Sequence, residues 1–342
     1  MDKIVKIVWI LFLFQITIAF SQNKNYKVYY QEINKAEEYY FLKENIDSSL
    51  YYYNKAFEEF DFAYARDLIN ATQIAFFEKK EYRKFLIKGF EQGIDLNDLK
   101  DINLFDSVYK ELVNDTSLLN KYIIAHNKYL HNIDSSYFNI IHAFYKKDQE
   151  DKNLPSYEYK EIKKIYKDKF KKWITEKGFP GEKLIGISVL DTNNLNDKLD
   201  TIITPFDTLY ITTKGSYKRS LSMDYSFPAL VHNKFSYLEL KDFLITAMYK
   251  GEIHPREIGM LHDNMYRPIE SNLDSSEVLD YKLSGVFKLN GFVDYSKYKC
   301  DNKEINSLRE KFYIAPIEID IKKKEYEKKY GFVLTWGFFN CL

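Results

Sequence analysis

The feature that most constrains the fold is the spacing of apolar residues in the first third of the chain. Between residues 29 and 90 they recur every three or four positions, as at Leu50, Tyr53 and Phe57. This spacing places side chains on one face of an α-helix. Asp47 stands just before one of these runs, where a helix needs a capping oxygen at its N-terminus. The pattern predicts a mainly α fold that begins with helical hairpins.

Small residues recur in this region at nearly constant intervals. Ala36 and Ala71 are 35 residues apart, and Ala56 and Gly89 are 33 residues apart. Small side chains let paired helices approach closely, and a period of about 34 residues is that of tetratricopeptide repeats. Residues 22–132 therefore resemble a tetratricopeptide-like helical repeat region. Such hairpins either offer a concave groove to a protein or peptide or act as a packing module for the second half.

The first 21 residues have the pattern of an export signal. Lys3 and Lys6 form a short positive head, residues 7–18 form an apolar run, and residues 19–21 follow with a small-x-small ending. A membrane-spanning helix needs about 20 apolar residues, and this run is shorter. We therefore expect residues 1–21 to be a signal peptide cleaved before Gln22. The mature chain is then exported, to the periplasm or outside the cell, without stable membrane insertion.

Composition limits the classes of partner. Lysine plus arginine and aspartate plus glutamate both number 50, so the formal net charge is zero. Nucleic-acid-binding proteins usually carry a basic excess, so we expect no nucleic-acid partner. In an exported protein the two cysteines, Cys300 and Cys341, either form a disulfide or remain as two thiols. Their spacing does not match a structural zinc site, and we predict neither a metal nor a cofactor.

Further helix signals occur in the second half. A helical apolar pattern over 157–177 ends at Gly178, a residue that suits the left-handed conformation at a helix C-terminus. Ser236 and Glu239 form a capping box ahead of another apolar stripe. Pro255 suits the first turn of the helix that follows. The second half is therefore predicted to be a helical domain.

A segment between these helices has a different composition. Residues 201–213 are rich in β-branched and aromatic residues, with Pro205 among them. Proline cannot donate a ladder hydrogen bond, so this segment does not fit a central strand. We predict a small β insertion, either a two-stranded ribbon or an irregular segment.

Six short motifs follow one another along the second half: Asp148-Gln149, Gly178-Phe179-Pro180, Ile185-Gly186, Leu230-Val231-His232, Leu261-His262-Asp263, and Arg309 with Ile314-Ala315-Pro316-Ile317. In order and spacing they resemble the uncharacterised bacterial family called domain of unknown function 6624. The resemblance implies that residues 133–342 form a domain of this kind. The chain departs from the family at Val231, where glutamine is usual, and at Asn264, where arginine is usual.

The polar residues of these motifs form the candidate catalytic set, Asp148, Gln149, His232 and Asp263. Imidazole titrates near neutral pH, so His232 could act as a general base oriented by one of the two aspartates. Glu252 and His254 are further candidates.

A metal site could instead draw on His232, His262 and Asp263. Adjacent residues such as His262 and Asp263, however, project about 100° apart on a helix. The sequence contains no HExxH, GxSxG or P-loop motif.

Two functions remain open from the sequence. We favour an exported, non-catalytic protein that binds a protein or peptide or acts as a scaffold. The alternative is a hydrolase centred on His232. Catalysis requires His232 and a carboxylate to converge in an open cleft. The scaffold interpretation predicts buried, hydrogen-bonded site residues and an apolar groove, if there is one, on the front helices.

Overall fold

The computed structural model describes residues 25–334 except 97–98, 100–101, 152–153, 155, 188–229, 232–235 and 266–301. All regular secondary structure in these residues is helical, and they contain no strand. This confirms the mainly α fold. The predicted signal peptide, the β insertion, His232, Cys300 and Cys341 lie outside the described residues.

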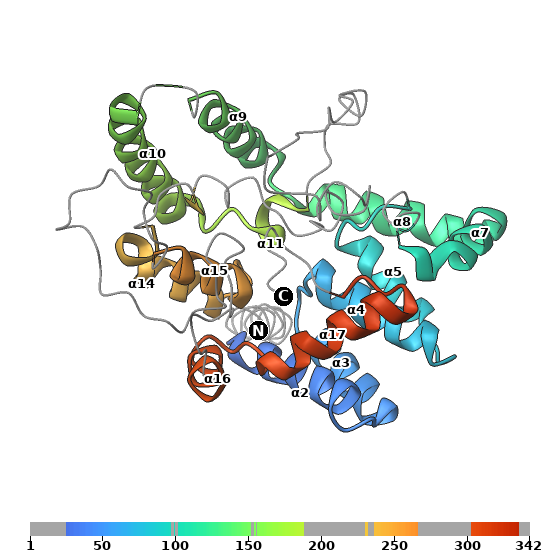
Figure 1. The fold of residues 1–342 in the computed structure, drawn as a ribbon. Coiled ribbons are helices and arrows are strands. Elements are labelled where there is room, and N and C mark those ends of the chain that lie inside the picture. Colours follow the sequence, from blue (N-terminus) through green and yellow to red (C-terminus); the bar gives the residue numbers. More distant parts are fainter. Residues whose placement is uncertain are drawn as a thin grey trace, which may run out of the picture.

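The helices follow in chain order as shown in Figure 1: α2 (Lys27–Phe41), α3 (Ile46–Glu59), α4 (Ala65–Phe77), α5 (Arg83–Glu91), the short 3₁₀ helix η1 (Asn103–Phe105), α7 (Asp106–Asn114), α8 (Thr116–Asn132), α9 (Ser135–Asp151), α10 (Ser156–Lys177), α11 (Glu182–Ile185), α14 (Ser236–Tyr249), α15 (Pro255–Met265), α16 (Asn302–Lys311) and α17 (Ile317–Tyr330). None of them is both long and apolar enough to cross a lipid bilayer.

The first four helices pair as two hairpins, α2 with α3 and α4 with α5. Ala36 and Ala56 are fully buried, as expected for small residues at close helix contacts. Gly89 is tightly enclosed too, because a Cβ there would lie 2.6 Å from Cδ1 of Ile94. The prediction that Asp47 caps the N-terminus of α3 was wrong by two residues. Asn45 is the N-cap and accepts a hydrogen bond from a backbone N–H in the first turn, where Asp47 lies.

Two of the helix boundaries in the second half are confirmed. Gly178 follows the end of α10 with φ +92°, and Pro255 is the first residue of α15. A positive φ strains any residue with a Cβ, so glycine fits this position for a physical reason.

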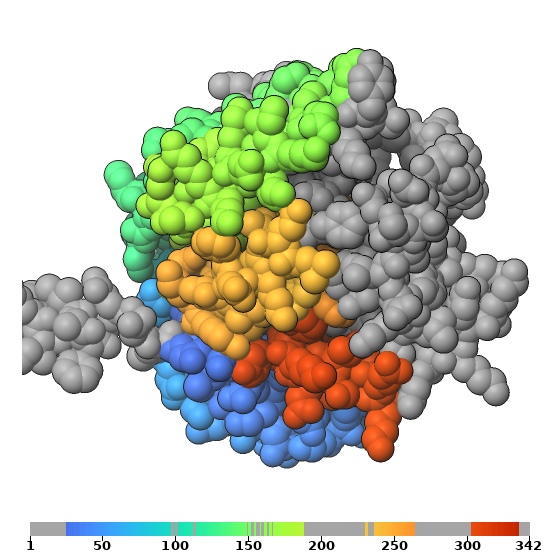
Figure 2. Space-filling view, turned by 90° about the vertical axis from the view of Figure 1, so that its left-hand side faces the viewer, coloured from blue at the N-terminus to red at the C-terminus, as the bar shows by residue number. Residues whose placement is uncertain are grey.

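The C-terminal helices return to the N-terminal hairpins. Helix α17 packs against α2, and one cluster of buried apolar residues extends from Tyr26 to Leu334. In Figure 2 the surfaces of the first hairpins, of α14 and α15, and of the C-terminal helices adjoin one another on one face. The predicted boundary between residues 132 and 133 stays a prediction, and many of the contacts described below cross it.

Candidate functional site

Of the sequence-predicted site residues, Asp148 and Gln149 lie on α9 and Asp263 lies on α15. Asp148, on α9, is 1% exposed. Asp263, on α15, is also buried, and its Oδ1 lies 3.0 Å from Nδ1 of His262. These adjacent side chains meet although they project from different sides of the helix. Helices α9 and α15, which carry these two aspartates, lie apart in Figure 1. His232 and the side chain of Gln149 lie outside the described part of the chain.

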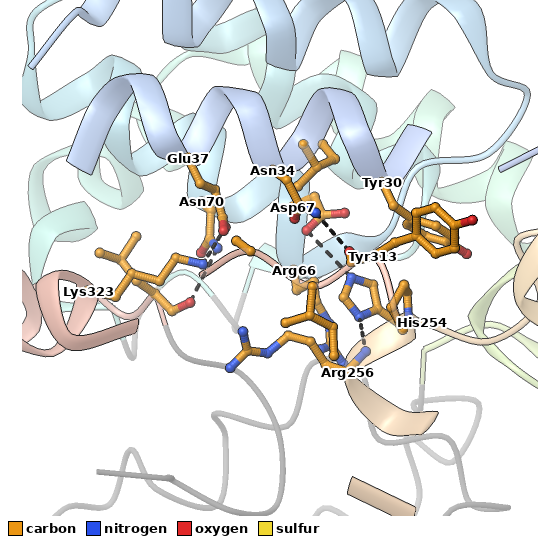
Figure 3. Close-up of a pocket in the computed structure, with 15 residues that line it drawn as sticks. Tyr30, Asn34, Glu37, Arg66, Asp67, Asn70, His254, Arg256, Tyr313 and Lys323 are labelled. Atoms are coloured by element: carbon orange, nitrogen blue, oxygen red, sulfur yellow. Dashed lines mark hydrogen bonds and ion pairs between the residues drawn. The ribbon is translucent and has the colours of Figure 1, made fainter. Parts of the chain in front are cut away.

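A small polar cavity lies elsewhere, where α2 and α4 meet α15 and the C-terminal segment (Figure 3). Its volume is about 30 Å³, which is room for one or two water molecules. The acidic and basic residues of its wall come from distant parts of the chain: Glu37, Arg66, Asp67, His254, Arg256 and Lys323.

Buried ion pairs join the N-terminal hairpins to the later helices. Nη2 of Arg66 on α4 lies 2.8 Å from Oε1 of Glu257 on α15. Lys323 on α17 forms an ion pair with Glu37 on α2. All four side chains are at least nine-tenths buried. A buried charge is costly unless it is paired, so these contacts lock the two regions together.

Asp320 on α17 completes this set of buried charges. It takes two hydrogen bonds from Arg256, at 3.0 and 2.9 Å, and one from Arg309 at 2.7 Å. Burial alone would raise the pKa of Asp320, but the two guanidinium groups hold that pKa well below its usual range. The carboxylate therefore stays ionised and fixes α15 to α17.

Asp67 and His254 face each other across the cavity. The hydroxyl of Tyr29 donates to Oδ2 of Asp67 at 2.8 Å, and Nε2 of His254 lies 4.0 Å from Oδ1 of Asp67. Burial, with the neighbouring charge of Glu37, raises the pKa of Asp67 to about 7. Burial and the nearby charge of Arg66 hold the pKa of His254 well below its usual value.

His254 is consequently a neutral, fixed ring. Its Nδ1 accepts a hydrogen bond from the backbone N–H of Arg256 at 3.2 Å, so its own proton sits on Nε2, on the side of Asp67. The ring packs edge-on against Tyr64, with centroids 4.8 Å apart. Perturbed pKa values in a cavity are typical of active sites, but buried ion-pair networks produce them too. The small volume here suits bound water.

Beside the cavity, helix α4 holds the main chain of a C-terminal segment. The Gln73 side chain donates from Nε2 to the carbonyl of Val333 at 2.7 Å and accepts at Oε1 from the N–H of Val333 at 2.8 Å. Asn70 donates to the carbonyl of Leu334 at 3.3 Å. The N–H of Leu334 donates to Glu327 of α17 at 2.8 Å. Side chains thus contact every main-chain polar group of two successive residues.

The side chains of this segment are buried on either side of that contact. Phe332 is 2% exposed, and its ring lies 4.9 Å from that of Phe77 on α4 and 5.6 Å from that of Tyr326 on α17. Leu334 is 1% exposed and lines the polar cavity. We call the surface of α4 and α17 that receives residues 332–334 the main-chain slot.

Helix α2 makes a similar contact one hairpin earlier. Nδ2 of Asn34 donates to the carbonyl of Tyr313, in the turn after α16, at 2.9 Å. Figure 3 shows Asn34 and Asn70 on the two neighbouring helices, both directed toward the C-terminal part of the chain. Amide side chains on the first helix of each hairpin therefore bind main chain from elsewhere in the protein.

A wider cleft, of about 330 Å³, lies between α10 and α14. Ile174, Phe243 and Ala247 contribute apolar surface to it, and Asp242 and Lys250 contribute charge. The scaffold interpretation placed an apolar groove on the front helices, and this cleft belongs to the second half instead.

Sequence reasoning named His254 but missed most of the cavity and the whole main-chain slot. A signal was present in α4. Its sequence is apolar apart from Thr72 and four larger polar residues, Arg66, Asp67, Asn70 and Gln73, which recur at helical spacing. Glu252, also named from the sequence, accepts a hydrogen bond from the N–H of Phe179 at 3.1 Å, a contact with the segment that follows α10.

Comparison with known proteins returned no match to a family model, to a curated protein or to a solved structure. Among the described residues, no group of three or more His, Cys, Asp or Glu side chains is arranged to hold a metal ion.

Proposed function

We propose that this protein is an exported, non-catalytic interaction module whose front hairpins bind the main chain of a protein or peptide partner. The observation that carries the proposal is the contact of Gln73 with both main-chain groups of Val333. The N–H and C=O of one residue point to the same side in a strand-like conformation, so a single amide side chain can pair with both.

Recognition of main chain suits binding more than chemistry. Main-chain hydrogen bonds supply affinity for any sequence, and pockets for individual side chains supply selectivity. Asn34, Asn70 and Gln73 lie on the inner helices of successive hairpins, where a repeat-like fold would present a partner surface.

The polar cavity supports the same interpretation. The ion pairs of Arg66 with Glu257 on α15 and of Glu37 with Lys323 on α17 fix the hairpins in place. A rigid platform loses little conformational entropy on binding, which favours affinity. The cavity volume of about 30 Å³ fits this structural role.

Selection of peptides tests the proposal. A random heptapeptide library is panned against the full chain and against the Val333→Pro variant, which lacks the N–H bound by Gln73. We expect enriched peptides that slow amide hydrogen exchange in α2 and α4. Their affinity should fall about tenfold in Gln73→Met, which keeps the side-chain length but removes both hydrogen bonds. The proposal is wrong if neither bait enriches peptides, or if Gln73→Met leaves their affinity unchanged.

A further inference from the structure

The residues that occupy the main-chain slot indicate which side chains a partner needs. Phe332 and Leu334 are both almost fully buried, whereas Val333 between them is half-buried. In a strand-like segment alternate side chains point to the same side. The slot therefore has one subsite beside Phe77 and Tyr326 for an aromatic ring and a second, at the cavity edge, for an aliphatic side chain.

The slot also forms a hydrogen bond with each main-chain polar group of residues 333 and 334. The N–H and C=O of Val333 pair with Gln73, the N–H of Leu334 pairs with Glu327, and its C=O pairs with Asn70. All three receptor side chains belong to α4 or α17, outside the bound segment. A different polypeptide with the same backbone conformation could make the same four hydrogen bonds.

The chain enters the slot through a sharp bend. Gly331 has φ +77° and ends α17 in the left-handed conformation. The bend separates the helix from the bound segment, so rotation about the dihedral angles of this one residue changes the direction of the segment without unwinding α17. A few residues at the end of an element are the usual place for such a hinge.

We infer that residues 332–334 occupy the partner site of this protein as an internal ligand, and that the partner is a strand-like polypeptide segment with an aromatic residue followed, two positions later, by an aliphatic one. This inference rests on the proposed function and names its partner and its regulation. The internal segment competes with the partner, so the apparent affinity is lowered by the fraction of molecules in which the slot is open.

The test compares the affinity of one peptide for two forms of the full chain. The probe is a fluorescein-labelled hexapeptide with the sequence of residues 331–336, and a scrambled hexapeptide is the matched control. Fluorescence anisotropy should show binding to Val333→Pro that is about tenfold tighter than binding to the unaltered chain. Adding Gln73→Met to Val333→Pro should abolish that gain, and the scrambled peptide should bind neither form.

Each outcome decides between the two proposals. Equal affinity of the hexapeptide for both forms would overturn internal competition but leave the interaction module standing. Library peptides that bind without an aromatic–x–aliphatic pattern would overturn the partner assignment alone. If no library peptide binds in a manner that depends on Gln73, the proposed function itself fails.

A measurement on the unaltered chain covers the case in which Val333→Pro does not fold. Native-state hydrogen exchange of the amides of Val333 and Leu334 is compared with that of amides in the middle of α4. We expect the two slot amides to exchange about tenfold faster or more, through an opening that leaves α4 closed. Exchange of all these amides in one global event would overturn the inference.

Discussion

The two ends of helix α4 hold the rest of the protein by different chemistry. Near its N-terminus, Arg66 forms a buried ion pair with Glu257. From the middle of the helix toward its C-terminus, the neutral amides of Asn70 and Gln73 bind main chain. Separating the ion pair leaves two buried charges without their partners, whereas a neutral amide can exchange one main chain for another or for water. One helix thus combines a contact that must stay closed with one that can open.

The largest effect is expected at the N-terminal end of α4, which we call the locked end because of its buried ion pair. Arg66→Met should lower the free energy of unfolding by about 3–5 kcal/mol, because Glu257 is left charged and buried. Urea denaturation followed by circular dichroism measures the loss. In the double variant Arg66→Met with Glu257→Leu, much of the stability should return. A loss in the single variant below that of Gln73→Met would contradict the contrast between the two ends.

The second test uses pH at the locked end. The pKa of Asp67 is raised to about 7 in the folded protein, above its unfolded value of about 3.9, so the folded state holds this proton more tightly. Asp67 should therefore make the free energy of unfolding fall as pH rises through the window between the two values, with no further loss above the folded pKa.

The matched control is Asp67→Asn, which keeps an acceptor for the hydroxyl of Tyr29 but does not titrate. Between about pH 4 and pH 8 its stability relative to the unaltered chain should rise by about 2–4 kcal/mol. Urea midpoints at a series of pH values measure this difference. A constant difference across the window would show that Asp67 keeps an ordinary pKa.

A smaller loss of stability is expected where the amides of α4 bind main chain. Gln73→Met should lower the free energy of unfolding by about 1–3 kcal/mol, since two main-chain groups of Val333 lose their partner. Water can reach the half-buried Val333 more readily than the charge pair, which keeps the cost below that of Arg66→Met. The same denaturation experiment compares the two variants directly, and equal losses would remove the distinction.

The smallest effect concerns the hinge. Gly331→Ala should cost about 1 kcal/mol, because φ of +77° is strained for any residue with a Cβ. The space at this position would accept a methyl group, since the nearest atom, Cβ of Asn103, would lie 3.5 Å away. A thermal melt measures the change, and an unchanged melting temperature would indicate that the bend carries no strain.

The sequence was most informative where structure depends on neighbours along the chain. Apolar spacing predicted the hairpins, and local conformational preference placed Gly178 and Pro255 at helix ends. These features depend on residues a few positions apart, which a sequence displays directly.

The polar cavity and the main-chain slot could not be predicted from neighbours along the chain. Lys323 and Glu37 are 286 positions apart, and nothing in the sequence around either residue indicates the other. The polar positions of α4 have the spacing of a solvent-facing stripe, and only the return of α15 and α17 makes them interior. Asp148 and Asp263 were grouped through motif order, which carries no information on distance between helices.

The contact of α17 with α2 has a consequence for the order in which the protein matures. Glu37 is synthesised well before its partner Lys323 on α17, which follows 286 positions later. Until α17 emerges, the carboxylate of Glu37 must stay hydrated, so the hairpins cannot bury this face. Chaperones that recognise incomplete cores would therefore still bind a product truncated before α17.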